Sequence, residues 1–282
     1  MTRAIIVVAL VPIIALIVWL SLSSAGVLQS RAVQTPDEIL LFRPTQYPDG
    51  YWNPQGLVYE DVWLNSADGT QLHAWYCPVA EPVAVVLYLH GNGGNLSHRA
   101  DVMTHLQTQI GVTTLILDYR GYGRSDGTPT VLGVMEDVRV ARAVLAEKAG
   151  VPESSVVLMG RSLGGALASA LAAEASPRGL VLESTFSSLR DIAGLHYTAL
   201  SSLVPKSKLN TVATIGEYDG PLLLSHGLHD DLIPYEMGVR IFAAAHSPKF
   251  FVTIAQGGHN AAQTMAYYEE LAKFLAGLAP NR

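Results

Sequence analysis

The sequence predicts an α/β protein built on a mostly parallel sheet with helices on both faces. Apolar runs of strand length alternate with helical patterns from about residue 58 to near the C-terminal end, as in chains made of strand–helix–strand units. The later apolar runs are unbroken, as expected for strands that are covered on both faces. No internal repeat interrupts this alternation, so one domain accounts for it.

The elements can be placed in order along the chain. Strands are expected at 58–64, 72–76, 83–89, 113–117, 156–159, 179–182, 221–225 and 249–254. The first two are joined by Ala-Asp-Gly at 67–69, a hairpin signal. Apolar residues at helical spacing predict helices at 99–109, 132–148, 163–174, 235–245 and 262–278.

The N-terminal run at 4–22 is apolar throughout. As a helix it would be about 28 Å long, close to the ~30 Å of a bilayer core. We predict a transmembrane signal-anchor at 1–25. A cleaved signal peptide and a buried helix are the alternatives, since the small residues at 23–25 resemble a cleavage site but the run exceeds a usual signal core. Arg3 before the run favours a single-pass membrane protein with its catalytic domain extracytoplasmic, or a secreted or periplasmic protein after cleavage.

Residues 26–56 contain several prolines and glycines without a sustained period, which indicates a stalk and an irregular lead-in. The domain itself is expected at 57–282. The chain has 24 acidic against 18 basic residues, which argues against nucleic-acid binding. Its one cysteine, Cys77, excludes an internal disulfide and a thiolate zinc cage.

Two copies of Gly-x-Ser-x-Gly occur, at 160–164 around Ser162 and at 123–127 around Ser125. A nucleophile elbow needs an apolar strand directly before it and a helix directly after it. Ser162 has both, whereas Ser125 is followed by loop residues. Ser162 is therefore the candidate nucleophile, and a tight turn without chemistry is the alternative.

A serine nucleophile needs a base, and the base needs a carboxylate to orient it. Of nine histidines, His259 follows the last strand in a Gly-Gly turn, where the carboxyl ends of parallel strands meet. Asp230 follows the strand at 221–225 and is the candidate carboxylate. Asp231 and Glu183 are the alternatives.

A tetrahedral oxyanion requires backbone donors placed in advance. The amide of Leu163, directly after the candidate nucleophile, is the first, and that of Asn92 in the glycine-rich loop at 90–95 is the second. A phosphate-binding loop is the alternative, but the lysine of such a loop and the third glycine of a dinucleotide fingerprint are both absent from this segment.

Five segments in order carry a resemblance to a known family: HGNGGNLSHR at 90–99, LDYRGYGRSDGTPT at 117–130, MGRSLGGALA at 159–168, LESTFSSL at 182–189 and SHGLHDDLIP at 225–234. The chain resembles the α/β-hydrolase superfamily over 58–278, and within it the membrane-anchored serine hydrolases of the bud-emergence type. The resemblance implies an α/β-hydrolase fold with about eight strands, an N-terminal transmembrane helix and an acyl-hydrolase site at Ser162, Asp230 and His259.

Residues 186–220 leave room for a small lid only. Its apolar members form either an acyl-chain wall or a helix packed on the sheet edge. We expect a serine hydrolase that cleaves acyl esters or thioesters, lipids among them, through an acyl-enzyme, with no metal and no organic cofactor. A serine peptidase or aminoacyl amidase with the same triad, and a membrane-tethered binding module, are the alternatives.

Overall fold

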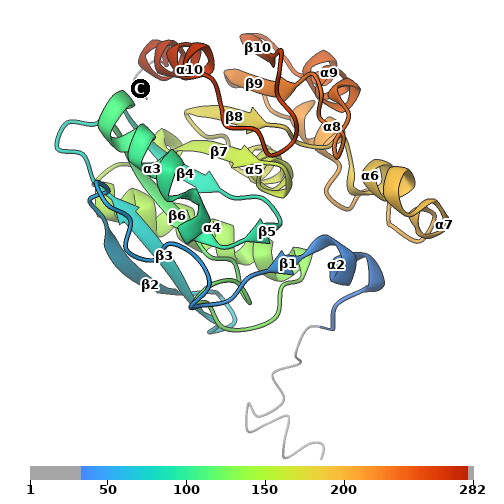
Figure 1. Ribbon diagram of the computed structural model, residues 1–282, viewed down its shortest axis with the longest axis horizontal. Coiled ribbons are helices and arrows are strands. Elements are labelled where there is room, and N and C mark those ends of the chain that lie inside the picture. Colours follow the sequence, from blue (N-terminus) through green and yellow to red (C-terminus); the bar gives the residue numbers. More distant parts are fainter. Residues whose placement is uncertain (1–32, 279–282) are drawn as a thin grey trace, which may run out of the picture. The chain divides into compact units, whose positions relative to one another are not determined.

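The computed structural model describes residues 33–278, without the side chains of Ala199 and Leu200. An eight-stranded sheet has the order β10-β9-β8-β7-β4-β6-β3-β2 (Figure 1). Its strands are β2 Glu60–Asn65, β3 Gln71–Cys77, β4 Ala84–Leu89, β6 Val112–Leu117, β7 Val157–Arg161, β8 Gly179–Glu183, β9 Leu222–Gly227 and β10 Lys249–Ile254. The eight strands and the mostly parallel sheet predicted from the sequence are confirmed.

Strands β4 and β6 to β10 are parallel, and β2 and β3 form an antiparallel hairpin at one end of the sheet. The distribution of apolar residues explains why the parallel strands are central and the hairpin lies at the edge. Every residue of β4 and β6 is buried, as expected for central strands with helices on both faces. In contrast, β2 exposes most of its residues at the edge.

Helices cover both faces of the sheet (Figure 1). Helices α4 Val131–Ala149, α5 Leu163–Glu174 and α9 Tyr235–Ala244 share one buried apolar cluster. Helices α3 Ala100–His105, extended by the π-helix η2 Leu106–Ile110, and α10 Met265–Gly277 share the other. Successive strand residues alternate between the clusters, as Val86 and Leu87 of β4 do.

The lead-in differs from the irregular segment that the sequence suggested. It contains helix α2 Pro36–Leu41 and the short strand β1 Arg43–Pro44, which pairs with β5 Gly93–Gly94. Glu38 caps α2 by accepting a hydrogen bond from the amide of Thr35, at 2.9 Å. Six residues are too few to show a helical period, which explains why the sequence pattern did not reveal α2.

The segment at 186–220, interpreted from the sequence as a small lid, contains three short helices, α6 Leu189–His196, α7 Thr198–Ser201 and α8 Thr211–Ile215. Short one-turn elements complete the fold, namely η1 Leu96–Arg99 and η3 Glu153–Ser155. The transmembrane segment predicted at 1–25 lies outside the described residues. Between residues 33 and 278, no helix combines the length and apolarity that a bilayer crossing requires.

Candidate active site

Ser162 lies on the sharp turn between β7 and α5. Its φ of 54° and ψ of −118° place it in a strained region of backbone space. Both motif glycines are needed for close packing, because a Cβ on Gly160 would collide with the Gly164 carbonyl oxygen, and one on Gly164 with the Leu89 carbonyl oxygen. The turn therefore presents the Ser162 side chain at the carboxyl end of the sheet.

The structure brings Asp230 and His259 together. Asp230 follows β9 and His259 follows β10, and Nδ1 of His259 donates to Oδ2 of Asp230 at 2.8 Å. The other carboxylate oxygen of Asp230 accepts from the Leu232 and Ile233 amides at 3.1 and 2.7 Å. This arrangement fixes the imidazole tautomer with its proton on Nδ1, so that Nε2 is left as the basic nitrogen.

Burial by itself would raise the pKa of Asp230. Hydrogen bonds from His226, from His259 and from the Ile233 amide outweigh burial and hold the pKa of Asp230 well below its ordinary value. Nε2 of His226 lies 3.5 Å from Oδ2 of Asp230. Asp230 is therefore ionised throughout the neutral pH range and can stabilise a positive charge on His259.

The two alternative carboxylates lie elsewhere. Asp231 is exposed to solvent. Glu183, at the end of β8, accepts a hydrogen bond from Nε2 of Gln263 at 2.9 Å. In the described part of the chain no hydrogen bond joins the Ser162 hydroxyl to His259, a contact that often tightens only when substrate binds.

Asn92 and Leu163, the predicted oxyanion donors, line the same pocket as Ser162. Asn92 is held firmly, because its side-chain amide donates to the Leu41 carbonyl at 2.9 Å and its own carbonyl accepts from the Tyr122 hydroxyl at 2.7 Å. Neither backbone N–H of the pair donates to another group within residues 33–278. Both are therefore available to a ligand at Ser162.

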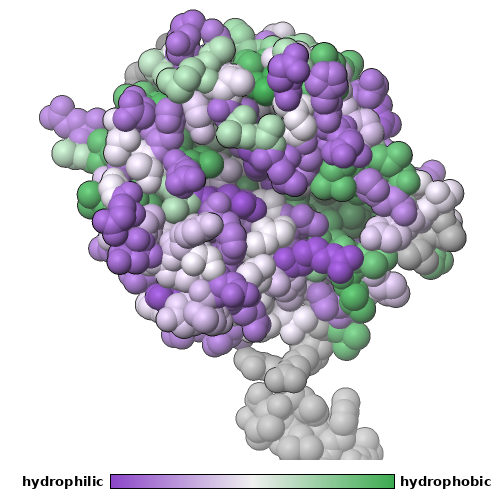
Figure 2. Space-filling view, in the orientation of Figure 1, coloured by the Kyte–Doolittle hydropathy of each residue, from purple (hydrophilic) through white to green (hydrophobic). Residues whose placement is uncertain are grey.

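A pocket of about 390 Å³ opens beside Ser162. Figure 2 shows it as a hollow on the right of the molecule, with apolar residues inside. Its walls come from α2, from lid helix α6 and from the loop after β9. The main apolar wall residues are Leu40, Leu41, Leu189, Ile192, Val204 and Ile233. The volume lies within the range of small-molecule sites.

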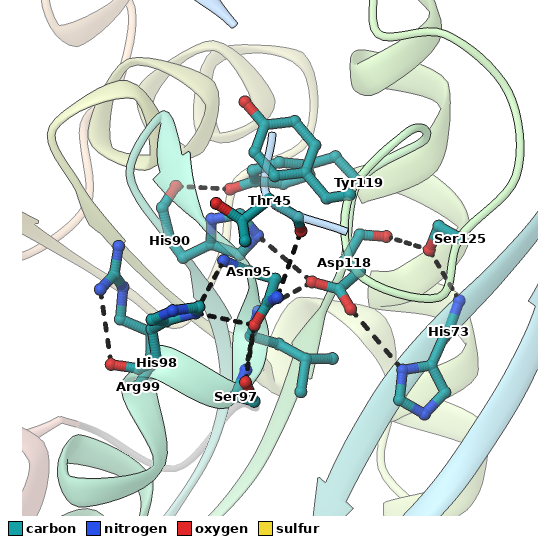
Figure 3. A network of polar contacts seen from close by, with 12 residues as sticks. Thr45, His73, His90, Asn95, Ser97, His98, Arg99, Asp118, Tyr119 and Ser125 are labelled. Atoms are coloured by element: carbon teal, nitrogen blue, oxygen red, sulfur yellow. Dashed lines mark hydrogen bonds and ion pairs between the residues drawn. The ribbon is translucent and has the colours of Figure 1, made fainter. Parts of the chain in front are cut away.

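A buried polar network joins the loop at 90–95 to the residues that follow β6 (Figure 3). The Ser125 hydroxyl donates to the Asp118 carbonyl at 2.7 Å and accepts from the His73 amide at 2.9 Å. One carboxylate oxygen of Asp118 accepts from the Leu96 amide at 2.7 Å. Ser125, the serine of the second Gly-x-Ser-x-Gly copy, therefore ties the loop after β6 to β3.

Two features of the site were not apparent from the sequence. Helix α2 supplies pocket walls through Leu40 and Leu41, and no pattern in the lead-in indicates this. Arg161 donates to the carbonyl oxygen of His259. In the sequence, only the position of Arg161 directly before Ser162 pointed to a role at the site. That position does not show which group the Arg161 side chain contacts.

A mostly parallel eight-stranded sheet, a serine on a strained strand-to-helix turn and an Asp–His pair after two later strands together define an α/β hydrolase. Residues 80–216 match the family model described as serine aminopeptidase, S33. The chain is 30% identical to the alpha/beta hydrolase domain-containing protein WAV2 of Arabidopsis thaliana, over 80% of this chain and 81% of WAV2. It is 29% identical to protein bem46 of Schizosaccharomyces pombe, over 78% of this chain and 77% of bem46. The chain thus belongs to the α/β-hydrolase superfamily and to its bud-emergence branch.

Solved structures agree with this fold. The Pyrococcus furiosus esterase Pf2001 superposes with a TM-score of 0.68 at 19% identity, covering 84% of this chain and 98% of that one. The acetyl xylan esterase of Paenibacillus sp. R4 gives a TM-score of 0.66 at 20% identity, covering 81% and 86%. At these identities the likeness supports the fold alone.

Proposed function

We propose that this protein is a serine hydrolase that cleaves carboxylic esters or thioesters with acyl chains through an acyl-enzyme at Ser162. The main support is the strained turn that presents Ser162 to an apolar pocket beside two backbone N–H groups without partners in the described chain. Such a turn costs free energy and persists where a side chain must be aimed.

The proposed reaction has two halves. Nε2 of His259 takes the proton of the Ser162 hydroxyl as the oxygen attacks the acyl carbonyl, and Asp230 stabilises the imidazolium. The amides of Asn92 and Leu163 donate to the oxyanion. The leaving alcohol or thiol takes the proton from His259, which leaves an ester on Ser162. Water, deprotonated by His259, then attacks this ester; the bond between the acyl carbon and the Ser162 oxygen breaks, the acid is released, and His259 returns the proton to Ser162.

The pocket lining favours acyl chains over the alternative substrate, an aminoacyl amide. An aminopeptidase needs a carboxylate for the charged amine of its substrate. Among the described lining residues Asp37 is the only carboxylate, and Nζ of Lys208 already pairs with it at 2.6 Å. The apolar wall formed by the α6 and α2 side chains suits an alkyl chain instead.

We also propose that the domain works close to lipid, held there by the segment predicted at 1–25. Large apolar side chains near the pocket are exposed: Leu195 by 49%, Tyr197 by 43%, Leu203 by 70% and Leu232 by 42%. Exposed apolar clusters of this kind mark contact surfaces. A single-pass membrane protein with an extracytoplasmic domain is the form we favour, with a secreted or periplasmic form as the alternative.

A fluorophosphonate probe and a series of p-nitrophenyl esters from acetyl to dodecanoyl test this function. We expect the probe to label the protein, labelling to vanish in Ser162→Ala, and labelling to persist in Ser125→Ala, its matched control from the second motif copy. Turnover should rise with chain length beyond acetyl. Hydrolysis of aminoacyl amides without ester turnover would instead favour the peptidase, and labelling of Ser162→Ala would exclude Ser162 as the nucleophile.

A further inference from the structure

The loop that carries His259 has no regular secondary structure of its own. It runs from the end of β10 at Ile254 to the start of α10 at Met265. An irregular loop of this length would let the imidazole move, yet a general base must be placed accurately relative to its nucleophile. The contacts that fix this loop therefore bear directly on catalysis.

One side chain ties the loop to the nucleophile strand. Nη2 of Arg161 donates to the carbonyl oxygen of His259 at 2.7 Å and to that of Ala261 at 3.0 Å. Arg161 directly precedes Ser162, so one short stretch of chain carries both the candidate nucleophile and the group that holds the loop of the candidate base. These two are the hydrogen bonds of the Arg161 side chain in the described part of the chain.

We propose that Arg161 is a positioning residue that sets the place of His259 relative to Ser162, an inference that rests on the proposed function of these two residues. A guanidinium suits this task, because it stays charged at all working pH values and carries several donors in one plane. Two carbonyl oxygens on either side of Asn260 then share a single nitrogen, which fixes the direction of the loop as well as its distance from β7.

A second tie on the neighbouring strand supports this role. Glu183 of β8 is the cross-strand partner of Arg161 in the sheet register. Its carboxylate accepts from Nε2 of Gln263 at 2.9 Å, two residues beyond Ala261. Residues at the ends of the adjacent strands β7 and β8 thus hold the His259 loop at every second residue, namely at positions 259, 261 and 263. Glu183, an alternative triad acid on sequence grounds, holds the loop through Gln263.

Steady-state kinetics on the full chain, with the p-nitrophenyl ester that it turns over best, test the role of Arg161. We expect Arg161→Met to lower kcat by about 10- to 100-fold with KM within about twofold, since a misplacement of ~1 Å costs up to about 10²-fold. Arg161→Lys keeps the charge and a single donor group, so it should recover part of the lost kcat. A kcat within twofold of the parent in Arg161→Met would overturn the proposal.

Arg142 offers a matched control for a merely structural arginine. It is more buried than Arg161, which is partly exposed, and it likewise donates to backbone carbonyls, those of Glu153 at 2.8 Å and Ala175 at 2.6 Å, away from the site. We expect Arg142→Met to lower the melting temperature but to leave kcat per folded molecule unchanged. Equal losses of kcat in both methionine variants would count against a specific role for Arg161.

Two outcomes separate this inference from the proposed function. Loss of activity in Ser162→Ala together with full kcat in Arg161→Met rejects the positioning role alone. Activity in Ser162→Ala rejects the proposed function itself. If Arg161→Met does not fold, Arg161→Lys tests the proposal in its place. We then expect a kcat below that of the parent with an unchanged KM. A kcat equal to that of the parent would overturn the proposal.

Discussion

His90 begins the loop that holds Asn92, and its complete burial should make folding sensitive to acid. Its side chain is inaccessible to solvent, and Nδ1 donates to the carbonyl of Gly91 at 2.7 Å. Nε2 has no hydrogen-bond partner in the described chain and lies 4.0 Å from a carboxylate oxygen of Asp118. Burial, with a smaller contribution from the charge on Arg99, lowers the pKa of His90 from 6.5 to about 3.

The sign of the effect follows from the protons bound in each state. Between pH 6.5 and about 3 the unfolded chain protonates His90 and the folded chain does not, so the free energy of unfolding falls as the pH falls. Each pH unit in this window costs about 1.4 kcal/mol. Going from pH 7.5 to pH 5 crosses about 1.5 units of it, a loss of about 2 kcal/mol, which is a large share of the 5 to 15 kcal/mol typical of a domain.

Urea unfolding at pH 7.5, 6.5, 5.5 and 5.0, compared between the parent and His90→Asn, measures this loss. The asparagine amide keeps a donor for the Gly91 carbonyl but does not titrate. We expect the variant to be less stable at pH 7.5 and the stability gap to shrink by about 2 kcal/mol at pH 5.

Other titrating groups are common to both proteins, including Asp118, whose pKa is raised by burial. They largely cancel in the comparison. His246→Asn is the control, since this half-exposed histidine pairs with an exposed Asp219. A stability gap between parent and His90→Asn that does not change with pH would refute the reasoning.

Three further predictions concern the site. Asp230→Asn should lower kcat by about 10⁴-fold in ester hydrolysis, because the imidazole of His259 then loses its orienting charge and tautomer; a melting temperature near that of the parent would separate this from unfolding. Gly164→Ala should reduce both the yield of folded protein and its melting temperature, since the new methyl collides with the Leu89 carbonyl, and a parental melting curve would contradict the contact. Ile192→Trp should fill the pocket and shift the kcat/KM preference toward acetyl esters, whereas an unchanged chain-length profile would place the acyl chain elsewhere.

The strands could be predicted because each one leaves a strong local pattern. All eight were expected within about two residues of their observed ends, since buried central strands read as unbroken apolar runs. Helix α2 could not be predicted in this way. Its stability comes from tertiary contacts, among them Glu38, which accepts from the amide of Val131, 93 residues away, at 2.9 Å.

The same distinction applies to the site. The turn around Ser162 is a local feature, and the strand before it and the helix after it identify it in the sequence. The contact between Arg161 and the His259 carbonyl depends on the order of strands in the sheet, because β9 and β8 lie between β10 and β7. No spacing of residues along the chain encodes that order directly, so this contact becomes visible only when the sheet is assembled.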